Sequence, residues 1–475
     1  MTTSQHVDVA VVGGGIAGLS TAWLLTQQRP GIRVTVFDAA ETVGGKLRQE
    51  KVAGHWVDVG AESVLARRPE AMALARDVGL GDEIIEPLTM TAGVRADGVT
   101  HPMPQRTLFG IPSDIDAVAD SGVLSTQALA RLRQELEMPP MAALEQDVTV
   151  GSLVRERLGD EVVDKLVEPL LGGVYAGSCD NISLAAAMPT LYAQLREGGG
   201  SLLGAVAQLM QPRTGASLSS PSFPFVSLRG GVATLPAALA DSGRFEVRTK
   251  TVVTALEKVA TGDGHKFVLR YGGGEHAGQL SADRVVIATP PSKSAALLHA
   301  VAPAAAALLK QVTTASMAIV TFAFDRSDIE QANFPAGSGQ LVAASEGLVT
   351  KALTYTSQKW PGAPADLFFL RGSVGKAGEV APLQWDDADL LQFVRADLAR
   401  LTGLSAQPVE AIITRWGGGL PQYAAGHVEL VRGIRDAVAL VEGLAVCGAT
   451  YDGVGIAACI GSAQAAVTRL FGADS

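Results

Sequence analysis

Three glycines near the N-terminus have the spacing of a site for a phosphate-bearing cofactor. Gly13, Gly15 and Gly18 follow the β-branched run VDVAVV and precede an apolar stretch of helical periodicity. The first glycine allows a tight turn, the second lets a pyrophosphate approach the backbone, and the third lets the helix pack on the strand. A helix N-terminus adds free N–H groups and a partial positive charge. The predicted dinucleotide-binding loop consists of Gly13, Gly14, Gly15, Ile16, Ala17 and Gly18.

An acidic residue and a second glycine turn indicate which dinucleotide this is. Asp38 ends the predicted strand RVTVFD, where a carboxylate accepts a hydrogen bond from the ribose 2′-hydroxyl and repels the 2′-phosphate of NADP. The turn GGKLR follows, and its Gly45 and Lys46 supply further N–H groups and a cation. An NAD site does not need this addition, so we expect the longer cofactor FAD.

A glycine-dotted turn near the C-terminus, CGATYDGVGIAACI at 447–460, runs into a helix of small residues. Its helix N-terminus suits an electron-rich carbonyl. We expect it to point at the flavin ring, where negative charge builds at N1 and the C2 carbonyl during hydride uptake. The predicted contacts are Gly448, Val454, Gly455 and Ile456.

The elements that must position these residues are spread along the whole chain. Short strand patterns recur over 245–271, and a buried strand returns at 281–291. An N-terminal strand–loop–helix, a long insertion, a small-strand meander, a returning strand and a glycine turn form the layout of a two-domain flavoprotein. Its FAD domain is interrupted by insertions.

Composition limits the other functions. The 475 residues exceed one ordinary domain, and 47% hydrophobic content allows a sizeable core. A net charge of −10 argues against nucleic acid. Three scattered cysteines argue against a disulfide framework and favour the cytoplasm. We expect no signal peptide, no transmembrane helix and, with seven dispersed histidines, no bound metal.

Together these motifs resemble the FAD-dependent amine oxidase and protoporphyrinogen oxidase superfamily over essentially the whole chain. Within it the chain is most similar to the Gram-positive type of porphyrinogen oxidase, the coproporphyrinogen III oxidases. The matching stretches are GGKLR, VGAESVLARRP, HPMP, GIPSD, GDEVVDKLVEPLLGGVYAG, TRWGGGLPQYAAGH and YDGVGIAACI. The chain departs from the family at two places: Asp38 stands where Glu is frequent, and Ala61–Glu62 replaces a Pro-Asp pair.

The resemblance implies an α/β fold in which a Rossmann-type FAD-binding domain is interrupted by an α+β substrate domain and a helical lobe. The FAD-binding domain would combine 1–62, 225–294 and 425–475. Residues 72–215 would form the helical lobe, with possible membrane association, and 295–415 the substrate-binding domain.

The resemblance also implies the reaction. Coproporphyrinogen III would be oxidised to coproporphyrin III in three two-electron steps of haem biosynthesis, with dioxygen as acceptor and hydrogen peroxide released. The aromaticity gained drives each step, so no catalytic side chain is expected and the protein's task is positioning. FAD would be noncovalent, because no His or Cys attachment motif is recognised. The product would pass to ferrochelatase, with at most peripheral membrane association.

Further site residues follow from the family's pattern. Val253 would offer its backbone to the adenine, Trp416 would flank the flavin, and Arg68 would bind a substrate propionate. Weaker candidates for propionate binding are Arg95, His101 and Arg371. The flavin-contacting segment would be Gly60, Ala61, Glu62 and Ser63.

Other functions remain open at this point. The substrate could be protoporphyrinogen IX. An amine oxidase would normally carry a tyrosine of its aromatic cage where Val454 stands. A carotenoid desaturase-like enzyme would need a long apolar channel. A flavin-bound haem-pathway binding protein would have no turnover.

Overall fold

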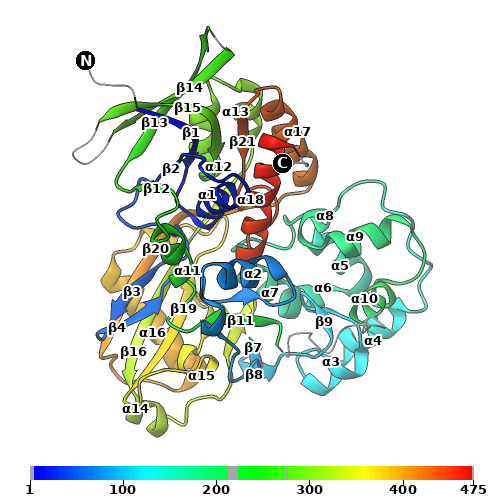
Figure 1. Cartoon of the computed structure of the whole chain (residues 1–475). Coiled ribbons are helices and arrows are strands. Elements are labelled where there is room, and N and C mark those ends of the chain that lie inside the picture. The colour runs from blue at the N-terminus through cyan, green and yellow to red at the C-terminus, as the bar shows by residue number, and fades with distance from the viewer. Residues whose placement is uncertain (1–4, 212–222, 263, 273–276, 473–475) are drawn as a thin grey trace.

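Two seven-stranded sheets and a group of helices make up the chain in a computed structural model (Figure 1). The structure describes residues 5–211, 223–262, 264–272 and 277–472. The fold is therefore of the mixed α/β type.

The first sheet gathers strands from both ends and the middle of the chain, in the order β12-β2-β1-β15-β14-β13, with β21 beside β15. Its strands are β1 (Gln5–Val12), β2 (Val34–Phe37), β12 (Glu246–Arg248), β13 (Val252–Thr261), β14 (Gly264–Gly272), β15 (Gly278–Ile287) and β21 (Leu444–Val446). The pairs β12–β2, β2–β1, β1–β15 and β15–β21 are parallel, whereas the pairs β15–β14 and β14–β13 are antiparallel.

Both faces of this sheet are covered, because the apolar residues of β1 alternate between them. Val9 and Val11 pack with α1 (Ile16–Gln28) and α18 (Ile456–Phe471). Ala10 and Val12 pack into a second core, on the opposite face. That core includes α12 (Pro291–Leu298), α13 (Pro303–Leu309) and α17 (His427–Ala439).

The second sheet has the order β20-β16-β19-β18-β17-β7-β8. Its strands are β7 (Ala92–Ala96), β8 (Val99–Pro102), β16 (Thr314–Asp325), β17 (Gly339–Val342), β18 (Thr350–Thr354), β19 (Leu367–Val374) and β20 (Glu410–Pro421). Helix α16 (Asp387–Thr402) packs on it through Leu390, Val394 and Leu398.

A separate core holds the helices of the middle chain, which project to one side in Figure 1. They are α3 (Ile115–Ser121), α4 (Thr126–Glu135), α5 (Val150–Leu158), α6 (Asp160–Val162), a π-helix (Val163–Val167), α7 (Glu168–Tyr175), α8 (Leu184–Ala187), α9 (Pro189–Arg196) and α10 (Leu202–Met210). Shorter elements near the site are β3 (Gln49–Val52), β4 (His55–Asp58), β5 (Val64–Leu65), α2 (Pro69–Asp77), β6 (Ile84–Ile85), β11 (Phe225–Leu228), α11 (Thr234–Ala240) and α15 (Thr356–Lys359).

The observed elements differ from the expected boundaries at two places. Strands β7 and β8 lie within the expected helical lobe, yet they extend the second sheet because β7 pairs in parallel with β17. Helices α12 and α13 lie mostly within the expected substrate domain, yet their apolar faces pack on the first sheet. Among the described residues, no helix is both long and apolar enough to cross a membrane.

Candidate functional site: two open helix N-termini

Helices α1 and α18 pack side by side, and each begins at a glycine with extended backbone (Figure 1). The N-cap residues are Gly15 and Gly455, which have no side chain that could cap the helix. Neither helix has an acidic residue in its first turn. A Cβ added to either glycine would meet nothing within 4 Å. Two sets of N–H groups therefore face open space, which suits an anionic or electron-rich ligand.

Two further glycines of the N-terminal loop, Gly13 and Gly18, are needed for packing. Gly13 has φ +113°, and a Cβ there would lie 2.8 Å from the Ala288 carbonyl oxygen. A Cβ on Gly18 would lie 1.9 Å from the Gly13 carbonyl oxygen. The loop therefore keeps its shape only with glycine at both positions, as the spacing predicts.

Asp38 holds this loop from the end of β2. Its carboxylate accepts hydrogen bonds from the backbone N–H of Gly14 and of Ala40, both at 2.7 Å. Val253 lies nearby on β13, because the N–H of Thr251 donates to the Asp38 carbonyl at 2.8 Å. The structure thus brings the start of β13, with Val253, close to Asp38 at the end of β2.

The GGK turn lies directly beside the loop. The N–H of Gly44 donates to the Gly14 carbonyl at 2.8 Å, and a Cβ on Gly45 would lie 3.4 Å from the Gly15 Cα. No carboxylate pairs with the Lys46 ammonium in the described part of the chain, and burial lowers its pKa. An unpaired cation next to two open helix N-termini fits a cofactor that carries a pyrophosphate.

The segment 58–62 completes this wall. A Cβ on Gly60 would lie 2.0 Å from the Lys46 carbonyl oxygen, which also accepts the Ala61 N–H at 3.1 Å. The Trp416 indole donates to the Val59 carbonyl at 3.2 Å. The structure thus brings Gly60, Ala61 and Trp416 together with Lys46.

Glu62 differs from its neighbours, because its carboxylate is engaged elsewhere. It pairs with Lys359 Nζ at 2.6 Å and with Arg371 Nη2 at 2.8 Å. Burial acts to raise its pKa, but the two cations hold the pKa below its ordinary value. Any contact of Glu62 with a cofactor is therefore through its backbone, and the half-buried Ser63 follows it into β5.

The C-terminal turn 447–455 is braced by residues that the sequence analysis did not single out. The Tyr423 hydroxyl donates to the Ala449 carbonyl, and His427 Nε2 lies 2.9 Å from the Thr450 carbonyl oxygen. The two rings stack with centroids 4.2 Å apart. Both residues lie in the motif TRWGGGLPQYAAGH. The four-residue spacing of Tyr423 and His427 was the sequence signal that could have indicated their pairing.

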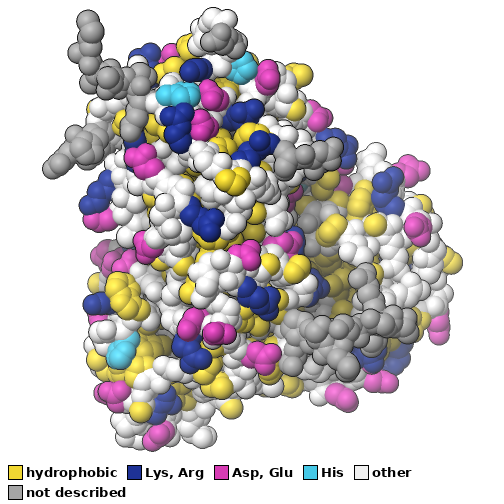
Figure 2. Space-filling view, viewed as in Figure 1, with side chains coloured by type: hydrophobic (Ala, Val, Ile, Leu, Met, Phe, Trp, Pro, Cys, Tyr) yellow, Lys and Arg dark blue, Asp and Glu magenta, His cyan; other side chains and the backbone are white. Residues whose placement is uncertain are grey.

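The same turn lies between the first sheet and the helical group and contacts both. Gly448 has φ +122°, and a Cβ there would lie 3.9 Å from that of Ala17. Ile456 is buried at the start of α18, whereas the half-buried Val454 packs against the core of the helical group. Figure 2 shows the hollow between this group and the rest of the molecule, with hydrophobic side chains gathered in it.

The candidate propionate-binding residues are less available than the sequence suggested. Arg68 directly precedes α2 as its N-cap and pairs with Glu70 at 2.5 Å; its side chain is 41% exposed. Arg371 is buried and engaged by Glu62, and Arg95 pairs with Glu346 at 3.3 Å. The structure therefore does not support Arg371 as a propionate contact, because its side chain is buried and both of its terminal nitrogens are engaged inside the protein.

Asp58 is a buried titratable group of this wall, and its charge is costly. Burial raises its pKa to about 6, although the Val232 N–H at 3.0 Å and the charge of Arg371 act in the opposite direction. Because the folded-state pKa lies above the ordinary value of 3.8, stability is lost as pH rises from about 4 to about 6. At pH 7 this loss is up to about 3 kcal/mol.

Asp58→Asn should therefore stabilise the protein at pH 7.5 and have little effect at pH 4.5, since Asn still accepts the Val232 N–H. Thermal unfolding at both pH values measures this, and a shift of several degrees confined to the higher pH is expected. The exposed Asp366→Asn is the control. An equal shift at both pH values would contradict the assignment of the cost to the Asp58 charge.

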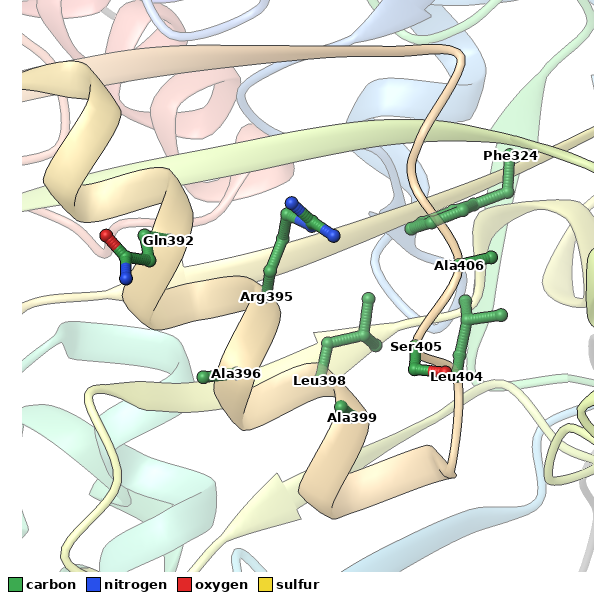
Figure 3. A pocket seen from close by; sticks show the side chains of 9 residues that line it. All are labelled: Phe324, Gln392, Arg395, Ala396, Leu398, Ala399, Leu404, Ser405 and Ala406. Carbon is green, nitrogen blue, oxygen red and sulfur yellow. The ribbon is translucent and has the colours of Figure 1, made fainter.

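Two other features lie apart from this site. A cavity of about 250 Å³ opens beside α16, with Arg395 and the buried Phe324 among its lining residues (Figure 3). None of the predicted site residues lines it. On the neighbouring strands β1 and β15, ligand atoms of His6, Asp8 and Asp283 lie within 4.8 Å of one another, a proximity that their spacing in the sequence does not show.

Comparisons with known proteins agree with this geometry. The flavin-containing amine oxidoreductase family matches residues 16–471. Coproporphyrinogen III oxidase of Mycobacterium tuberculosis is 36% identical over 462 residues, covering 97% of this chain and 96% of the relative. The enzyme of that name from Bacillus subtilis is 31% identical, with 97% of each chain covered.

A solved structure shows the same fold at comparable sequence identity. An Exiguobacterium protein, provisionally named a protoporphyrinogen oxidase, matches with a TM-score of 0.84 and 31% identity over 98% of both chains. The chain belongs to the flavin-containing amine oxidoreductase family.

Proposed function

We propose that this protein is an FAD-dependent oxidase that converts coproporphyrinogen III to coproporphyrin III, with dioxygen as acceptor. The observation that carries the proposal is the pair of open, glycine-capped helix N-termini beside the unpaired Lys46. Full-length relatives named coproporphyrinogen III oxidase support the choice of substrate.

In this proposal the cofactor is held noncovalently between the two chain ends. The N–H groups of the Gly13–Gly18 loop and Lys46 bind the pyrophosphate, Asp38 accepts the ribose hydroxyl, and Val253 contacts the adenine. The flavin lies against Gly60–Ser63, Trp416 and the 448–456 turn. When bound, FAD supplies hydride acceptance from carbon and reoxidation by dioxygen.

The protein's own task is then to place a large anionic macrocycle beside the flavin and keep water out. We assign the FAD-binding role to the first sheet, the substrate-binding role to the second sheet, and the covering wall to the helical group. Val454 would meet the substrate, because it lies where the turn faces the helical group. No side chain is required as an acid or base.

The proposal extends to the setting of the reaction. A porphyrin product must next receive its metal, so transfer to a ferrochelatase fits, with at most peripheral contact to a membrane. The three cysteines are free and buried, which fits a reducing compartment such as the cytoplasm.

The test is turnover by the purified holoprotein under air. Coproporphyrinogen III should give the fluorescence of coproporphyrin III and three equivalents of hydrogen peroxide per porphyrin. Protoporphyrinogen IX and a panel of primary amines serve as competing substrates. Faster oxidation of an amine, or flavin that no porphyrinogen reduces anaerobically, would overturn the proposal.

Arg68→Ala should raise KM for coproporphyrinogen III with a smaller change in kcat, because a propionate contact is made equally in the ground and transition states. Arg68 is partly exposed and already paired with Glu70. We therefore expect about 1 kcal/mol, roughly 5-fold in KM. Steady-state kinetics at low and high salt measures this.

Glu70→Gln is the matched control, because it releases Arg68 and should lower KM or leave it unchanged. Protoporphyrinogen IX has two propionates in place of four, so it should be less affected if Arg68 binds a group that only the tetra-acid carries. An unchanged KM in Arg68→Ala for both substrates would leave this arginine as a surface residue.

A further inference from the structure

The segment 58–62 is held from the second sheet by one buried arginine. Arg371 lies on β19, and its Nη1 donates to the Asp58 carbonyl at 2.8 Å and to the Gly60 carbonyl at 2.9 Å. Its Nη2 lies 2.8 Å from the Glu62 carboxylate. A planar guanidinium can reach three acceptors of one segment in this way, which a single ammonium cannot do with the same geometry.

Packing does not hold the segment on every side. A cavity of about 220 Å³ has Asp58, Glu62 and Trp360 among its lining residues. The buried Asp58 Oδ1 has no hydrogen-bond partner in the described part of the chain. The place of the segment is therefore set by its polar contacts more than by close packing.

The opposite side of the segment lies against the cofactor-binding residues. Gly60 lies so close to Lys46 that a Cβ would meet its carbonyl oxygen, and a Cβ there would also lie 3.1 Å from the Trp416 ring. A shift of Gly60 would therefore displace either the Trp416 indole or the backbone of Lys46, whose side chain is the unpaired cation.

We infer that Arg371 is a positioning residue, which fixes the 58–62 segment and with it Lys46 and Trp416 at the cofactor site. It acts through backbone carbonyls and touches neither substrate nor cofactor. The inference rests on the proposed function only in placing FAD at this site. It also gives strand β19 of the second sheet an indirect part in cofactor binding.

The chain offers a matched control in Lys359. Its ammonium pairs with the same Glu62 carboxylate at 2.6 Å, but no backbone carbonyl of the 58–62 segment is among its contacts. Removing either cation leaves Glu62 with the other. A difference between the two variants therefore reports the carbonyl contacts and not the loss of one buried charge.

The experiment compares Arg371→Met, Arg371→Lys and Lys359→Met as holoproteins. The readouts are the FAD dissociation constant, the visible flavin spectrum, and kcat and KM for coproporphyrinogen III. Arg371→Met should weaken FAD binding at least 10-fold, shift the flavin bands and lower kcat while KM changes less than 3-fold. Arg371→Lys should recover part of the loss, and Lys359→Met should stay within 3-fold of wild type.

Two results would overturn the inference. One is an FAD affinity and flavin spectrum in Arg371→Met that match those of wild type. The other is an equal loss in Lys359→Met, which would assign the effect to the charge of Glu62. If Arg371→Met does not fold, Arg371→Lys and Lys359→Met decide by the same comparison. FAD affinity and spectrum need no porphyrinogen, so failure of the substrate assignment would leave this test intact.

Discussion

Gly15→Val is expected to give a folded protein that does not retain FAD. The site in front of Gly15 is open, and its backbone, with φ −72° and ψ 175°, is one that valine adopts readily. The fold should therefore tolerate the side chain, whereas a pyrophosphate could no longer reach the N–H groups of α1. Loss of two charge-assisted hydrogen bonds costs about 3 kcal/mol, or roughly 100-fold or more in FAD affinity.

Flavin absorbance after gel filtration and equilibrium titration of the apoprotein measure this effect, and circular dichroism checks the fold. Gly15→Ala should give a smaller loss, because its one methyl group fills less of the space. A folded Gly15→Val variant with a full complement of flavin would show that the open N-terminus of α1 serves another purpose.

Val454→Tyr is expected to keep FAD and lose turnover. Val454 packs against the helical group, so a ring there enters the space assigned to the macrocycle. Overpacking of this kind costs about 1–3 kcal/mol, which corresponds to roughly 5- to 150-fold in kcat/KM. Steady-state kinetics with coproporphyrinogen III measures the loss.

Val454→Ala is the matched control, because it changes the size of the side chain in the opposite direction. Its kcat/KM for coproporphyrinogen III should stay near that of wild type. FAD content should be equal in all three proteins. Undiminished turnover in Val454→Tyr would show that the 451–456 turn does not line the substrate site, and the site would have to be placed elsewhere.

Local pattern was sufficient to predict the elements that hold the N-terminal loop and the last helix. The β-branched run before Gly13 forms β1, the periodic stretch after Gly15 forms α1, and the turn before Ile456 leads into α18. In each case the signal is carried by neighbouring residues, through propensity and glycine geometry.

Pairing between distant segments could not be predicted in the same way. Strands β7 and β8 join a sheet whose next strand begins at Gly339. Arg371 was a candidate propionate contact because of its positive charge, but it lies buried against the backbone of Asp58 and Gly60. An arginine can bind a ligand or the backbone of a distant segment of the same chain. Which of the two it does depends on which strands become neighbours, and one sequence does not show that.

The joining of α1 and α18 also has a consequence for biosynthesis. The helix that starts at residue 16 is made long before strand β21 and its partner helix at 456–471. During translation, the first sheet lacks one strand and the glycine loop faces no second helix. Domains generally fold as units. A complete flavin site therefore forms only after residues 444–471 have been made, long after translation of the glycine loop.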